Sequence, residues 1–218
     1  MVIKSFSLWA PGVETKDDWM KWYVGEKEID DSSAAPKITF ASPITTRRFS
    51  QLTKMTCYMA NHLGIDDVDG LFFTSVRGEI EMQYKINAEF AMNNETKPAA
   101  FAISVFNTAP AQATILLKSK IPYTPVFSGF NNVIRNLVII GSAPIKTSRM
   151  KSSILIYAEE KVPYEYRNNL EYPIFFPLCI GIKLSAGNDD NRLFTDESLK
   201  SPTSFARYLI ETKQGCWL

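Results

Sequence analysis

The succession of predicted elements is densest in residues 99–141, AAFAISVFNTAPAQATILLKSKIPYTPVFSGFNNVIRNLVIIG. The pattern predicts a buried strand over Phe101–Phe106 and a small-residue helix over Thr108–Lys118. A second strand is expected over Tyr123–Ser128, followed by a tight turn at Ser128–Gly129 and a second helix. A strand that passes through a glycine turn into a helix is where α/β enzymes often hold a nucleophile or bind an anion. This turn is therefore the first candidate functional site.

The same alternation of strand and helix extends outward on both sides. We predict a strand over Leu71–Val76, a helix over Ile80–Phe90 and another strand over Ser153–Ala158. Such alternation is typical of an α/β domain whose sheet is largely parallel and covered by helices.

The ends of the chain add further elements. Val2–Trp9 predicts a first strand, and Pro173–Ser185 a long apolar strand in which Pro177 marks an edge or a bulge. The clearest helix covers Thr45–Gly64, where apolar residues recur on one face and the glycine suits the left-handed C-terminal position. Ser204–Lys213 predicts a closing helix.

Composition excludes several classes of protein. The chain has 218 residues, which fits a single domain over residues 1–218, and 45% of them are hydrophobic. A net charge of +1 gives no reason to expect a nucleic acid or an anionic membrane as partner. No apolar run approaches the roughly 20 residues of a membrane span, and the first residues lack a signal-peptide layout.

The cysteines and the single histidine restrict the chemistry further. Cys57, Cys179 and Cys216 show no metal-ligand spacing, and the first two fall in apolar patterns typical of buried small hydrophobes. We therefore expect no metal, no cofactor and a cytoplasmic location. Because His62 is the only histidine, any Ser–His or Cys–His dyad would have to use it.

Two groups of charged residues need an explanation. Arg47 and Arg48 fall at the start of the predicted helix, where cations oppose the helix dipole, so either an anionic partner or simple exposure could account for them. Glu79 ends a predicted strand and could be a catalytic carboxylate, although glutamates at helix N-termini are common for structural reasons.

Four segments together resemble a known family. They occur in the order and spacing of small β-ketoacyl-synthase-like proteins, commonly described as chain length factors of type II polyketide systems, notably aryl polyene pigment clusters. The segments are Thr46–Met55, Phe73–Glu79, Ile103–Ala111 and Tyr157–Tyr166. The resemblance covers nearly the whole chain and implies the N-terminal half of a thiolase-like α/β fold, with a central mixed sheet covered by helices.

The stretch quoted first also resembles the part of full-length condensing enzymes that precedes their nucleophile. Aligned without gaps, Asn107 matches an asparagine of that family, Ile121–Pro122 matches its Gly-Pro, and Phe130 falls where the nucleophilic cysteine would be. The usual Ser-Val-His-Asn run of the small proteins reads Ser104-Val105-Phe106-Asn107, so a role tied to that histidine is not expected. Likewise Pro110–Ala111 stands where Ala-Gly is usual.

This alignment changes the expected chemistry. Condensation needs a thiolate and two imidazoles, whereas the aligned position holds Phe130 and the chain has one histidine. The resemblance therefore implies a non-catalytic subunit that pairs with a full-length ketosynthase and shapes the tunnel for the growing acyl chain. Phe101, Phe106, Asn107 and Phe130 are the candidates for the interface and the tunnel wall.

Two other hypotheses remain open. The first is a small acyl-transfer or hydrolytic enzyme that uses Ser128 or Cys57 with His62. The second is a scaffold that recruits acyl carrier protein, in which Arg47 and Arg48 would pair with acidic helices of the carrier.

Overall fold

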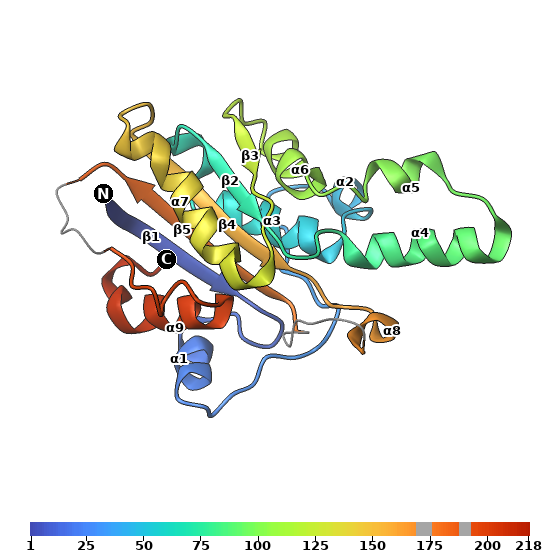
Figure 1. Cartoon of the computed structure of the whole chain (residues 1–218), viewed down its shortest axis with the longest axis horizontal. Helices are drawn as coiled ribbons and strands as arrows, with labels where there is room; N and C mark the ends of the chain where they lie inside the picture. Colours follow the sequence, from blue (N-terminus) through green and yellow to red (C-terminus); the bar gives the residue numbers. More distant parts are fainter. Residues whose placement is uncertain (169–175, 188–192) are drawn as a thin grey trace.

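A five-stranded sheet in the order β1-β5-β4-β2-β3 runs through the centre of the molecule (Figure 1). It is seen in a computed structural model that describes residues 1–168, 176–187 and 193–218. The strands are β1 (Val2–Trp9), β2 (Leu71–Thr74), β3 (Tyr123–Pro125), β4 (Ser152–Glu159) and β5 (Leu178–Ser185).

The sheet is mixed, as the family resemblance implies. The central strand β2 pairs in parallel with both β3 and β4, while β5 pairs antiparallel with β4 and β1. The expectation of a largely parallel sheet is therefore correct only for β2, β3 and β4, the strands that helices connect. Since β5 lies inside the sheet, the prediction of an edge or bulge at Pro177 is wrong: the proline precedes Leu178, where the ladder begins. Residues 173–175 of that predicted strand lie outside the described residues.

Helices cover both faces of the sheet. On one face α3 and α6 pack over the apolar side chains of β2 and β4, and on the other α7 and α9 pack over β1, β4 and β5. The helices are α1 (Lys16–Tyr23), α2 (Pro43–Thr46), α3 (Gln51–His62), α4 (Ile80–Asn93), α5 (Pro98–Ala102), α6 (Thr108–Leu116), α7 (Val133–Lys146), α8 (Tyr164–Arg167) and α9 (Pro202–Thr212).

Two glycines let the helices approach the sheet closely. A Cβ atom on Gly181 of β5 would overlap the side chain of Met59 in α3. On the opposite face, a Cβ on Gly141 of α7 would lie 2.7 Å from Leu155 of β4. Larger residues at either position would push a helix away from the sheet and open the core.

The long predicted helix over Thr45–Gly64 is two helices. Ser50 interrupts it: its backbone is extended and its hydroxyl accepts a hydrogen bond from the Thr53 amide at 2.9 Å, which makes it the N-cap of α3. Arg47 and Arg48 consequently lie between α2 and α3, exposed. Gly64 adopts the left-handed conformation with φ of 71°, as the sequence predicts.

The predicted buried strand over Phe101–Phe106 is wrong. Pro98 opens the short helix α5, in which Phe101 is 62% exposed, and the chain then turns before α6. A proline at the first helical position followed by alanines favours a helix, and this local preference prevails because the segment reaches no sheet edge. The helix predicted next, Thr108–Lys118, is confirmed as α6.

Helices α4 and α5 form an arm that extends away from the sheet (Figure 1). Of the residues of α4 only Ile80, at its start, is buried. Apolar side chains are left exposed farther along: Phe90 is 52% exposed and Met92 is 76% exposed. Such exposure of large apolar groups marks a surface suited to a partner.

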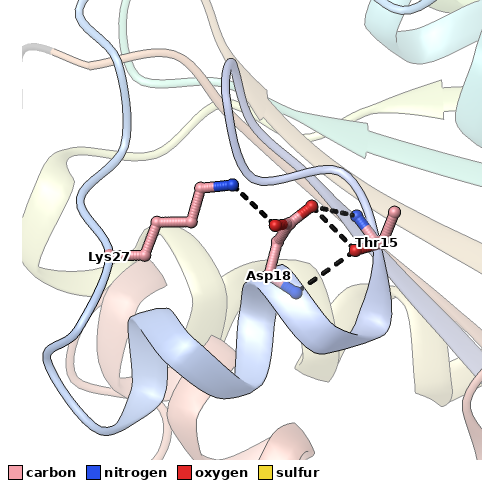
Figure 2. A network of polar contacts seen from close by, with 3 residues as sticks. All are labelled: Thr15, Asp18 and Lys27. Atoms are coloured by element: carbon pink, nitrogen blue, oxygen red, sulfur yellow. Dashed lines mark hydrogen bonds and ion pairs between the residues drawn. The ribbon is translucent and has the colours of Figure 1, made fainter.

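The short helix α1 is held by a local polar network (Figure 2). Thr15 accepts a hydrogen bond from the Asp18 amide, while the Asp18 carboxylate accepts hydrogen bonds from the Thr15 amide and hydroxyl. Lys27 lies 2.6 Å from the same carboxylate. The helix places Trp19 in the core, where its indole donates a hydrogen bond to the Leu8 carbonyl of β1.

Candidate functional site

The four segments that carry the family resemblance meet at the carboxyl ends of β2 and β4. Thr53 of the first donates a hydrogen bond to Glu79 of the second at 2.8 Å. Glu160 of the fourth accepts one from the Leu52 amide of the first at 3.3 Å. Thr108 of the third lines a cavity together with Thr53. Positions separated by up to 108 residues therefore form one site.

Glu159 is the last residue of β4 and supports the loop that follows β2. Its carboxylate accepts hydrogen bonds from the amides of Val76 at 2.8 Å and Arg77 at 3.1 Å, and from the Ser75 hydroxyl at 3.2 Å. Glu159 is fully buried, and this burial raises its pKa to about 7 against the lowering effects of those hydrogen bonds and of the Arg77 charge.

Glu160 joins two helix N-termini. Besides the Leu52 amide of α3, its carboxylate accepts a hydrogen bond from the Glu81 amide of α4 at 2.9 Å. Burial, with the nearby Glu79 charge as a second cause, raises the pKa of Glu160 to about 8. One side chain thus ties the starts of both helices to the end of β4.

Glu79 completes this group of buried carboxylates. It lies at the N-terminus of α4 with no exposed surface, and burial raises its pKa to about 7 although hydrogen bonds from Ser50 and Thr53 act in the opposite direction. Its contacts are with protein groups that hold α3 against α4. They accord with the structural interpretation of Glu79 rather than the catalytic one.

Phe106 lies at the centre of an aromatic cluster beside these carboxylates. Its ring centroid is 5.7 Å from that of Phe73 in β2 and 4.2 Å from that of Phe127. A Cβ on Gly78 would lie 3.2 Å from the Phe106 ring, and Gly78 has φ of 61°, so the glycine is needed on both counts. Phe127 is 70% exposed, so the cluster runs from the core to the surface.

Two adjoining hollows lie beside the start of α3. One is a mainly apolar cavity of about 190 Å³, and its lining includes Phe49, Thr53, Met82, Ile103 and Thr108. The other is a polar recess of about 350 Å³ whose lining includes four cationic side chains and one carboxylate: Arg47, Arg48, Lys54, Lys85 and Glu81. Arg48, Phe49, Ser50 and Met82 line both hollows.

The connection at Ser128–Gly129 differs from the tight turn that the sequence predicts. Strand β3 ends at Pro125, and Gly129 is extended with φ of −69° and open space where a Cβ would be, so no tight glycine turn is formed. A short 3₁₀ helix, Phe130–Asn132, then leads into α7. The Ser128 hydroxyl donates to the Gly129 carbonyl and accepts a hydrogen bond from Asn136 at 2.9 Å. A strand-to-helix connection is present without the strained geometry of a nucleophile turn.

The structure does not bring Ser128, Cys57 and His62 together. His62 ends α3, which leads through Gly64 to the beginning of β2, whereas Ser128 follows the carboxyl end of the parallel strand β3. Cys57 is buried on the other side of α3 from the exposed His62, and burial, followed by the Glu79 charge, raises the pKa of Cys57 to about 12. His62 instead stacks on Tyr58, with ring centroids 5.5 Å apart.

The other candidate residues lie around the same edge of the sheet. Phe130 is half-buried in the 3₁₀ helix and Asn107 is exposed at the N-terminus of α6. Phe106 is half-buried, while Phe101 lies farther out on the exposed arm. Phe106 is therefore the candidate tied most directly to the core.

Sequence reasoning missed the buried carboxylates at the carboxyl end of β4. The charged run Glu159-Glu160-Lys161 is typical of an exposed polar loop, yet both glutamates have no exposed surface. A signal was present, because the pair lies at the carboxyl end of β4, and this end is beside that of β2, the strand that precedes Glu79. Among the residues that the structure describes, no three His, Cys, Asp or Glu side chains are grouped to hold a metal ion. Within the same residues, every helix falls short of the length and apolar character of a membrane span.

Comparison with known proteins gives one family match. Residues 19–213 match the model described as "Beta-ketoacyl synthase, N-terminal domain". No curated protein matches the sequence.

Solved structures share the fold at low sequence identity. A chain from the ketosynthase (ApeO) in complex with its chain length factor (ApeC) from Xenorhabdus doucetiae matches with a TM-score of 0.78 and 23% identity, covering 98% of this chain and 92% of that one. The ishigamide ketosynthase/chain length factor matches with a TM-score of 0.66 and 14% identity, over 88% and 63% of the two chains.

A modular enzyme provides a more distant match. The ketosynthase from module 6 of the bacillaene synthase of Bacillus subtilis 168 matches with a TM-score of 0.59 and 10% identity, covering 84% of this chain and 36% of that one. The chain thus spans about a third of that ketosynthase. At these sequence identities the structural similarity establishes a shared fold and nothing beyond it.

Proposed function

Because the chain belongs to the family of β-ketoacyl synthase N-terminal domains, we propose that it is a non-catalytic chain length factor. In this role it pairs with a full-length ketosynthase and shapes the tunnel that receives the growing acyl or polyene chain of a type II polyketide or fatty-acid-like pathway. The single observation that carries the proposal is Phe130, which stands where the family's nucleophilic cysteine aligns. The domain extent of 1–218 and the cytoplasmic location belong to the same proposal.

The surface around β3 supports a protein partner. Strand β3 is at one end of the sheet, so its outer backbone groups have no neighbouring strand within the described residues. Two exposed apolar side chains lie close to it: Phe127, which follows the strand and is 70% exposed, and Ile115 of the neighbouring α6, which is 68% exposed. A strand edge beside exposed apolar groups suits pairing with another sheet.

Phe106 is the proposed tunnel wall. It contacts the exposed Phe127 on one side and the buried Phe73 on the other, so its ring closes the path between the surface at β3 and the core. Phe101, Asn107 and Phe130 are proposed for the surrounding interface. A large ring held by two others can end a tunnel at a fixed depth.

Co-expression with the ketosynthase encoded nearby tests the pairing. We expect a stable complex that co-purifies through a tag on either subunit and elutes as one species in size-exclusion chromatography. A ketosynthase that never co-purifies with this chain, and is soluble and fully active alone, would contradict the proposal.

Product length tests the tunnel wall. In the reconstituted pair, Phe106→Leu removes the ring but keeps an apolar side chain, and we expect longer products by mass spectrometry. Phe194→Leu makes the same change in a half-buried ring that packs against Phe205 of α9, so it is the matched control and should leave the product distribution unchanged. If Phe106→Leu and Phe101→Ala both leave the distribution unchanged, neither residue limits chain length.

Arg47 and Arg48 are proposed contacts for acyl carrier protein. Both are exposed, and no ion pair involves them among the residues that the structure describes. Replacing both by glutamate should weaken carrier binding in a pull-down assay. Unchanged binding would count against this contact.

A further inference from the structure

The two hollows at the start of α3 differ in character and share a wall. The cavity presents Phe49, Met82 and Ile103, and its volume of about 190 Å³ exceeds the roughly 150 Å³ that is enough to hold benzene in an apolar core. The adjoining recess is lined by polar and charged groups. A ligand that occupied both would need an apolar part and a polar part.

The charge of the recess favours an anion. Four cationic side chains line it against one carboxylate, that of Glu81, whose partner Lys85 lies 2.8 Å away. Within the described residues, no ion pair engages Arg47, Arg48 or Lys54. The N-terminus of the 12-residue helix α3 lies in the same wall and adds to the positive potential. Three cations around one recess therefore have no anionic partner in the part of the chain that the structure describes.

One polar group in the cavity wall has no hydrogen-bond partner among the described residues. Thr108 is only 7% exposed, and its hydroxyl makes no hydrogen bond to any described residue. Burying a hydroxyl without a partner is unfavourable, so we expect a water molecule at this part of the wall, beside the apolar part of a ligand. Thr53, in the same wall, has its hydroxyl committed to Glu79.

We propose that the cavity and the recess together bind an amphiphilic anion, with a short apolar chain of roughly six carbons among Phe49, Met82 and Ile103 and its anionic head group at Arg47 and Arg48. The head group is a phosphate ester or a carboxylate. The site belongs to this chain alone, so the inference stands apart from the proposed pairing with a ketosynthase and is tested without that partner.

Calorimetric titration of the full 218-residue chain with four probes tests the site. The probes are hexyl phosphate, hexanoate, 1-hexanol and inorganic phosphate. We expect hexyl phosphate or hexanoate to bind at least ten-fold more tightly than both 1-hexanol and inorganic phosphate, and the tighter of the two identifies the head group. Binding of both anions no tighter than that of 1-hexanol or of inorganic phosphate would overturn the proposal.

Variants locate the binding. Arg47→Gln with Arg48→Gln should weaken the tighter anion at least ten-fold and leave 1-hexanol unchanged. The matched control is Lys146→Gln with Arg149→Gln, which removes two exposed cations at the end of α7 and should change nothing. Equal weakening by both pairs would show general charge attraction and overturn the site, as would no weakening by the first pair.

A third variant reports on the cavity without disturbing the surface. Ile103→Trp fills the cavity from its half-buried wall and should abolish the advantage of hexyl phosphate over inorganic phosphate. Retention of that advantage in a variant with the same circular dichroism spectrum as the original chain would place the apolar chain elsewhere and contradict the proposal.

Discussion

Carboxylates satisfy helix N-termini in two regions of this molecule, and the two regions are built in opposite ways. At α1, Asp18 and Thr15 are three residues apart and the network is at the surface (Figure 2). At α3 and α4, Glu160 reaches amides 108 and 79 residues away in sequence and has no exposed surface. The first is local, and the second exists only in the folded chain.

Burial determines how each region responds to protons. The hydrogen bond from Lys27, followed by those from Thr15, holds the pKa of Asp18 well below its ordinary value. Burial instead raises the pKa of Glu160 to about 8, although the same kind of amide hydrogen bond acts against the rise. A hydrogen-bonded carboxylate is therefore stabilised as an anion only where water or a cation compensates for its charge.

The largest effect should come from removing the buried carboxyl. Glu160→Ala leaves the Leu52 and Glu81 amides without their partner, and an unsatisfied buried donor costs about 1–3 kcal/mol. We expect the free energy of unfolding to fall by about 2–4 kcal/mol in urea denaturation. Glu211→Ala, at an exposed position of α9, is the control and should change it by less than about 0.5 kcal/mol. Equal effects from the two changes would mean that Glu160 does not hold the two helices.

A smaller effect should appear in the pH dependence. The folded pKa of Glu160 lies above its ordinary value of 4.5, so its contribution is complete below pH 4.5 and is lost as the pH rises toward about 8. Glu160→Gln cannot ionise, so we expect the loss of stability between pH 5 and pH 8 to be about 2 kcal/mol smaller than in the original chain. Urea denaturation at pH 5 and at pH 8 measures this loss of stability in both chains. Identical losses in both chains would show that Glu160 is ionised throughout this range.

The smallest effect should be at α1, where exposed groups can turn to water. Thr15→Ala removes the side-chain cap and should cost about 1 kcal/mol, whereas Thr15→Ser should be nearly neutral. Because the pKa of Asp18 is lowered, its contribution is present at neutral pH and is lost only as the pH falls below about 4. If Thr15→Ala were as damaging as Glu160→Ala, burial would not explain the contrast between the two regions.

The pattern of apolar residues was sufficient to predict the strands of the sheet. The predicted strands over Val2–Trp9 and Ser153–Ala158 match β1 and β4 closely, because their burial leaves a clear apolar pattern. It failed over Phe101–Phe106, where the chain leaves α5 at Ala102 and turns before α6. An apolar run predicts burial, but Phe101 and Val105 of this one are exposed.

The candidate site was only partly accessible to sequence reasoning. The four family segments were identified correctly, but their convergence depends on strand pairing between β2 and β4, which the sequence does not state. The acidic pair Glu159–Glu160 resembles a loop by composition, because charged residues are usually exposed. Glu160 is buried by the two helix N-termini that it joins, and Glu159 by the loop that follows β2. The placement of Phe101, Phe106, Asn107 and Phe130 at an interface stays a prediction.

Hydrogen exchange in the arm formed by α4 and α5 would report where a partner binds. Its outer turns are held by few buried groups, so their backbone amides should exchange hydrogen for deuterium quickly in the isolated chain, well before those of β4. A partner that covers Phe90, Met92 and Phe101 would slow this exchange, whereas a partner bound at the β3 edge alone would leave it fast. The peptides that gain protection would therefore map the contact surface before any complex is crystallised.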